Sequence, residues 1–99
     1  MTGYIYEVNM EGPVQIQQSF QRWLDGHIGK MLEIPLFTEA TQVQLGASEG
    51  KFQIRVIYGM KSSDALNEYI DDYSEKMRSE LPAEYDGQIK YRRFHYSPY

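Results

Sequence analysis

Regular alternation along residues 51–60 is the feature that most constrains the fold of this chain. Every second side chain there is apolar: Phe52, Ile54, Val56, Tyr58 and Met60. A period of two places successive side chains on opposite faces of a strand. The segment therefore predicts a β-strand with one apolar face, and no other segment gives a clearer strand signal.

The remaining pattern predicts three more strands and two helices. Alternation and β-branched or aromatic content indicate strands at about 4–10, 37–45 and 89–96. Apolar residues at three- and four-residue spacing indicate helices at about 14–32 and 62–81. Pro13 suits the first helical position, and Ser62, Ser63 and Asp64 suit the start of the second helix. Residues 46–50 are typical of a hairpin loop.

The order strand–helix–strand–strand–helix–strand predicts a single α+β domain over residues 1–99. Right-handed crossovers give the ferredoxin-like arrangement, an antiparallel four-stranded sheet in which the fourth strand lies beside the first, then the third, then the second. Each helix has one apolar stripe, so both helices are expected on the same face of the sheet.

The other face of this sheet is also expected to be apolar. Alternation puts Phe37, Val43 and Leu45 on one side of the second strand, and Phe94 and Tyr96 on one side of the fourth. Large exposed apolar patches are rare on monomers. We therefore expect a homodimer in which the open sheet faces pack about a two-fold axis. The alternative is a monomer with a tyrosine-rich, partly wet face.

Composition excludes several classes of function. The formal net charge of −4 opposes nucleic-acid binding, which requires a basic surface. The chain has no cysteine, which excludes disulfides and thiolate metal sites. No apolar run approaches the roughly 20 residues of a membrane span. A cytoplasmic protein without a metal or a cofactor is the simplest expectation.

Several short motifs resemble a small bacterial family of unknown function. They are Tyr4-Ile5-Tyr6-Glu7-Val8-Asn9, Trp23-Leu24 with His27-Ile28 and Met31-Leu32, Ser63-x-Ala65-Leu66-x-x-Tyr69, and Arg92-Arg93. The resemblance implies the dimeric α/β-barrel superfamily, in which two ferredoxin-like sheets pack face to face. Antibiotic-biosynthesis monooxygenases, haem-degrading enzymes and muconolactone-isomerase-like proteins belong to it. The family itself implies no activity.

The haem-degrading relatives use an Asn, a Trp and a His at fixed places. Asn9 corresponds to the Asn on the first strand, but Met60 replaces the Trp, and the second helix has no His. The resemblance therefore opposes haem degradation. A second resemblance, of residues 5–10 to the first strand of RNA-recognition domains, fails because Gly50-Lys51-Phe52-Gln53-Ile54 lacks the second aromatic residue.

His27 is the candidate catalytic residue, because it is a titratable group on the apolar stripe of the first helix. The alternative is a half-buried histidine that is hydrogen-bonded to a neighbouring carbonyl or carboxylate. Trp23, Tyr4, Tyr6 and Tyr58 are candidates for the walls of a ligand site. They could equally be packing residues of the core and the dimer.

Arg55 is a further candidate for ligand binding, and Arg92 and Arg93 share its ability to bind a carboxylate or phosphate. Pairing with Glu7 and Glu39 across strands is the favoured alternative.

Two functions fit these patterns. The first is a non-catalytic homodimer that binds a small molecule or a protein. The second is a cofactor-independent monooxygenase or isomerase that acts on a small aromatic or polyketide-like molecule. The second predicts that His27 faces a closed pocket of a few hundred cubic ångströms.

Overall fold

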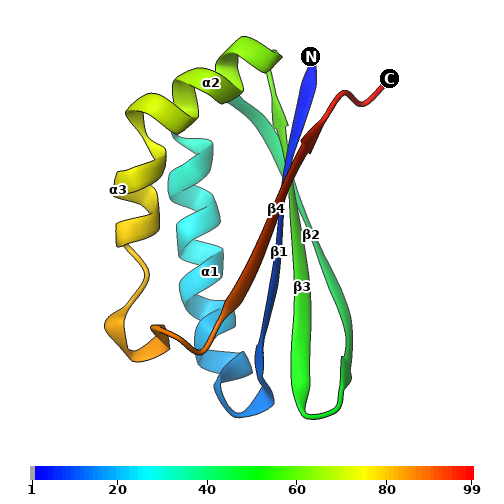
Figure 1. Ribbon diagram of the computed structural model, residues 1–99, viewed down its shortest axis with the longest axis vertical. Helices are drawn as coiled ribbons and strands as arrows, with labels where there is room; N and C mark the ends of the chain where they lie inside the picture. The colour runs from blue at the N-terminus through cyan, green and yellow to red at the C-terminus, as the bar shows by residue number, and fades with distance from the viewer. Residues whose placement is uncertain (1) are drawn as a thin grey trace.

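The computed structural model describes residues 2–99 and confirms the ferredoxin-like α+β fold (Figure 1). The elements in chain order are β1 (Tyr4–Pro13), α1 (Gln17–Leu32), β2 (Phe37–Ser48), β3 (Lys51–Met60), α2 (Ser63–Asp72), α3 (Ser74–Ser79) and β4 (Lys90–Tyr96), with short 3₁₀ turns at Val14–Ile16 and Ala83–Tyr85. The sheet order is β2-β3-β1-β4 with antiparallel pairing throughout, as predicted.

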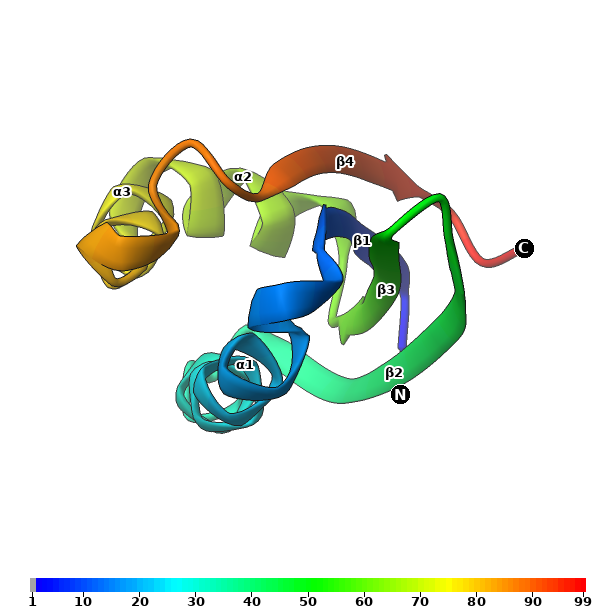
Figure 2. The same ribbon diagram turned by 90° about the horizontal axis from the view of Figure 1, so that it is seen from below.

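All the helices lie on one side of the sheet, with α1 beside β2 and β3 and with α2 and α3 toward β4 (Figure 2). The core fills the space between these layers. Phe20 and Leu24 of α1 pack there over Phe52, Ile54 and Val56 of β3, all fully buried. No helix within residues 2–99 has the length and apolar character needed to cross a membrane.

The second predicted helix is two helices, which corrects the expectation of one continuous element. The break falls at Tyr73, whose φ of −128° and ψ of −33° are not helical. Ser74 donates a hydrogen bond from its hydroxyl to the carbonyl of Ile70 at 2.8 Å, a contact that bends helices. The break lets Tyr69 of α2 and Met77 of α3 both bury their side chains against the sheet layer.

The β2–β3 hairpin differs from the prediction at both ends. Its strands extend to Ser48 and Lys51, so the loop is only Glu49 and Gly50, both with positive φ. A register shift between Phe37 and Glu39 turns Phe37 into the core, whereas strict alternation placed it beside Val43.

The side of the sheet without helices is called here the open sheet face. The strand register places on it the side chains of Ile5, Glu7, Asn9 and Glu11 from β1, Gln53, Arg55 and Ile57 from β3, Val43 and Leu45 from β2, and Lys90, Arg92, Phe94 and Tyr96 from β4. Glu7 is only 6% exposed on this face. The Tyr96 hydroxyl donates to Glu7 at 2.7 Å, and the Arg55 Nε lies 3.4 Å from its other oxygen.

Candidate functional site: a cavity between the helices and the sheet

A partly open cavity of ≈ 120 Å³ lies between the helices and the sheet, and we call it the helix–sheet cavity. Its aromatic wall consists of Tyr6, Trp23, Tyr58, Tyr69 and Tyr91. Its aliphatic and methionine side chains are Val8, Met10, Leu24, Met31, Met77 and Leu81, and its strongly polar ones are His27, Arg78 and Arg93. An apolar pocket with a few polar groups is the usual form of a small-molecule site.

His27 reaches the cavity because it follows Trp23 by one helical turn on α1. The two rings stack, with centroids 4.7 Å apart and an interplanar angle of 18°. The Nδ1 atom of His27 is buried, and no group within residues 2–99 hydrogen-bonds to it. The expectation of a histidine satisfied by the protein therefore does not hold for this nitrogen.

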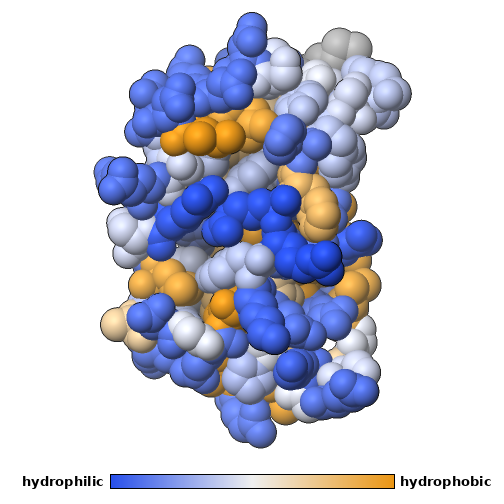
Figure 3. All heavy atoms as spheres, in the orientation of Figure 1, coloured by the Kyte–Doolittle hydropathy of each residue, from blue (hydrophilic) through white to orange (hydrophobic). Residues whose placement is uncertain are grey.

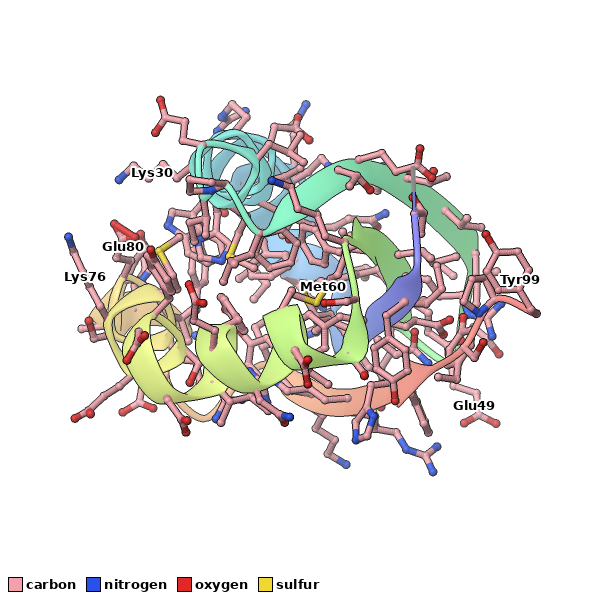
Figure 4. The ribbon with its side chains drawn as sticks, turned by 90° about the horizontal axis from the view of Figure 1, so that it is seen from above. Lys30, Glu49, Met60, Lys76, Glu80 and Tyr99 are labelled. Atoms are coloured by element: carbon pink, nitrogen blue, oxygen red, sulfur yellow. The ribbon has the colours of Figure 1, made fainter. Side chains whose placement is uncertain are left out.

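Burial lowers the pKa of His27 below its ordinary value of 6.5. Glu80 partly opposes this shift by raising the pKa, and Lys30 lowers it further. Figure 4 shows Lys30 and Glu80 reaching toward each other from α1 and the end of α3, and their ion pair measures 3.1 Å. The imidazole of His27 is consequently neutral at neutral pH, the form that can accept a proton or a hydrogen bond.

The tyrosine wall is held in place by ring packing more than by hydroxyl contacts. Tyr6 lies 6.0 Å from Tyr58 and 5.6 Å from Tyr69 between ring centroids. Burial raises the pKa of both Tyr58 and Tyr69, so these hydroxyls stay protonated and act as neutral donors. Tyr4 does not line the cavity; its hydroxyl contacts Nδ1 of His95 at 2.8 Å.

The structure thus brings together four of the predicted site residues, His27, Trp23, Tyr6 and Tyr58, and separates Arg55 from them. Arg55 lies on the open sheet face and pairs with Glu7, as the favoured alternative predicted. It borders a second, wider hollow of ≈ 670 Å³ on that face, together with Asn9 and Arg92.

Arg92 and Arg93 are neighbours in sequence but lie on opposite faces of β4. Neither forms the predicted ion pair with Glu7 or Glu39 within the described residues. The Arg92 guanidinium lies 5.9 Å from the ring centroid of Phe94, and that of Arg93 lies 4.9 Å from that of Tyr91. Arg93 borders the helix–sheet cavity, and so does Arg78 of α3, which sequence reasoning missed because nothing near it marks a site.

No group of three or more potential metal ligands occurs among residues 2–99. Asn9, the residue that matched the haem-degrading pattern, lies on the open sheet face and therefore on the opposite side of the sheet from His27.

Solved structures of the same fold cover nearly the whole chain at low identity. A protein from Bacillus cereus described as an antibiotic biosynthesis monooxygenase superimposes with a TM-score of 0.68, at 13% identity over 98% of this chain and 93% of its own. SnoaB, a cofactor-independent oxygenase from Streptomyces nogalater, gives 0.66 at 9% identity over 98% and 94%. The heme-degrader MhuD from Mycobacterium tuberculosis gives 0.63 at 10% identity over 94% and 93%. These likenesses show the fold alone.

The search of curated proteins found no match to this chain. Residues 3–95 match the profile of a family described as domain of unknown function DUF4286, and the chain therefore belongs to that family.

Proposed function

We propose that this protein binds a small molecule with a single ring in the helix–sheet cavity, and that His27 is its hydrogen-bonding partner. The observation that carries the proposal is that His27 lines an aromatic-walled cavity and that its buried Nδ1 has no hydrogen-bond partner within residues 2–99. A buried polar atom without a partner costs roughly 1–3 kcal/mol, which a bound ligand would recover.

The size of the cavity limits the ligand. At ≈ 120 Å³ it is smaller than the few hundred cubic ångströms expected for a polyketide-binding enzyme. An apolar cavity of roughly 150 Å³ in another protein holds one benzene molecule. The helix–sheet cavity is smaller than that but partly open, so a single planar ring is the largest group that it could take up.

Trp23 makes the proposal testable, because it is the only tryptophan in the chain and lies in the cavity wall. Titration with benzamide, a neutral one-ring probe, should change its fluorescence saturably. Leu81→Phe narrows the cavity and should weaken binding at least fivefold. Leu32→Phe, on the exposed side of α1, is the matched control and should not. Equal affinity in both variants would place the probe elsewhere and refute the proposal.

A second candidate is a cofactor-independent enzyme in which His27 accepts a proton from the bound molecule. The neutral imidazole and its unsatisfied Nδ1 favour it. SnoaB is an oxygenase that also works without a cofactor, although the two chains share only the fold at 9% identity. In this case His27→Gln should retain benzamide binding within a few-fold, because the amide keeps the hydrogen bond, and should abolish turnover of any substrate found.

The open sheet face is proposed to pack against the same face of a second copy. Exposed apolar side chains support this: Leu45, Phe94 and Tyr96 are each more than 40% exposed. The face is also self-complementary in charge, since Glu7 and Glu11 of β1 lie beside Arg55, Lys90 and Arg92. The buried Oδ1 of Asn9, on the same face, accepts no hydrogen bond from residues 2–99.

Sedimentation velocity over a range of concentrations tests the dimer. The unmodified protein should sediment as a dimer, and Phe94→Lys should shift it toward monomer by placing unmatched charge in the interface. Ile70→Lys introduces the same charge on exposed α2 and should leave the dimer intact, as Ile70 is 47% exposed on the helical side. A concentration-independent monomer of the unmodified protein would refute this proposal.

A further inference from the structure

The charge around the helix–sheet cavity has the opposite sign to that of the whole chain. The chain carries a formal net charge of −4, yet the cavity lining includes Arg78 and Arg93 and no carboxylate. The nearest acid that acts on His27 is Glu80, and it is already paired with Lys30. Neither arginine forms an ion pair with any residue in the described part of the chain. Two uncompensated cations therefore border a mostly apolar space.

Arg93 lies on the helix-facing side of β4, between Tyr91 and His95. It pairs with Val8 across β1 and shares the helix-facing side of β4 with Tyr91, whereas Arg92 takes the opposite side. The Arg93 guanidinium rests on the ring of Tyr91 at 4.9 Å, which orients it without neutralising it.

Arg78 and Arg93 line the cavity and are also exposed to solvent, so they lie at its opening and not at its floor. Figure 3 shows the most hydrophilic side chains gathered in a band across the middle of the face that β4 crosses. The floor below is formed by buried residues such as Leu24 and Met31. A ligand that fits this gradient has an apolar ring at one end and a negative group at the other.

We infer that the helix–sheet cavity selects a small carboxylic acid, with its ring between Trp23 and the tyrosines and its carboxylate bound by Arg93 and Arg78. This inference rests on the proposed function and adds the chemical class of its ligand. Guanidinium groups bind carboxylates through paired N–H donors, and one such charge-assisted contact changes affinity by about tenfold or more.

The test compares benzoate with benzamide, which has the same shape and no charge, by Trp23 fluorescence at about 0.15 M salt to screen distant charges. The unmodified protein should bind benzoate at least tenfold more tightly than benzamide. Arg93→Gln should weaken benzoate about tenfold and leave benzamide within twofold, and Arg78→Gln should act in the same direction. Arg93→Lys should keep part of the preference for benzoate over benzamide, because lysine keeps the positive charge but lacks the paired N–H donors of the guanidinium group.

Arg92→Gln is the matched control, because it removes the same charge from the adjacent residue on the other face of the sheet. It should leave both probes unchanged. Equal binding of benzoate and benzamide to the unmodified protein would overturn the inference while leaving cavity binding intact. Equal losses of benzoate affinity in Arg92→Gln and Arg93→Gln would also overturn the inference, since the effect would then come from the net charge of the protein. Binding of neither probe would overturn both this inference and the proposed function.

Discussion

Leu24→Ala tests whether the helix–sheet cavity is a real and rigid feature of the core. Leu24 is 1% exposed and lines the cavity. Truncation removes roughly three methylene equivalents, or about 2.4 kcal/mol at about 0.8 kcal/mol each. The new space merges with an existing cavity whose walls are held by stacked rings, so it should not collapse, and the remaining void adds to the cost. We expect a loss of about 3–4 kcal/mol in the free energy of unfolding.

Urea denaturation followed by far-ultraviolet circular dichroism measures this loss without relying on Trp23. Leu32→Ala is the control, because it makes the same substitution on the same helix at a side chain that is 41% exposed. It should cost less than about 1 kcal/mol. The denaturant slope should stay unchanged in both variants, so that the midpoint reports stability alone.

The same variant gives a second measurement, on binding. A larger cavity should admit a substituted ring that the unmodified protein excludes, and that ligand should raise the midpoint of Leu24→Ala according to its concentration and Kd. Equal losses at Leu24 and Leu32 would show that α1 does not pack as described. If Leu24→Ala lost much stability but still excluded the substituted ring, the cavity walls would have collapsed into the new space. That result would refute a rigid cavity.

Two further predictions concern the titratable groups. Because burial lowers the pKa of His27 in the folded state, the unfolded state binds more protons just below pH 6.5. The free energy of unfolding should therefore fall as the pH drops through that value, by at most about 1.4 kcal/mol per pH unit. His27→Gln should remove this part of the loss in urea titrations at several pH values. Glu7→Gln should cost about 1 kcal/mol in the same assay by weakening the contacts to Tyr96 and Arg55, whereas exposed Glu39→Gln should be neutral, and equal effects would contradict the assigned network.

The fold could be predicted because local pattern and global topology agree. The alternation at residues 51–60 identified β3 to the residue, and the order of elements with right-handed crossovers left one sheet arrangement. The errors arose where a single contact overrides the pattern. The Ser74 hydroxyl bends the second helix, and the bulge at Phe37 reverses one side chain of β2. Neither the hydrogen bond of Ser74 nor the bulge at Phe37 has a distinctive sequence signal.

The site could be predicted only on the elements with strong periodicity. The stripe on α1 placed Trp23 and His27 on the sheet side, and alternation placed Tyr6 and Tyr58 on the helix side. Whether Nδ1 of His27 finds a partner depends on packing between elements far apart in the sequence, which a single sequence does not specify. For Arg55 the strand pattern allows both ligand binding and pairing with an acid on the neighbouring strand, and the structure shows the pair with Glu7.

The pair Arg92 and Arg93 shows how one strand can serve two purposes. A period of two sends the first guanidinium to the open sheet face and the second to the cavity. On the open face, Arg92 lies among acids and apolar residues that suit a second copy of the chain. On the cavity side, Arg93 forms no ion pair with any of residues 2–99, so its charge remains available to a ligand. If both proposals hold, dimer formation and acid binding should be separable, because each depends on a different arginine of the same dipeptide.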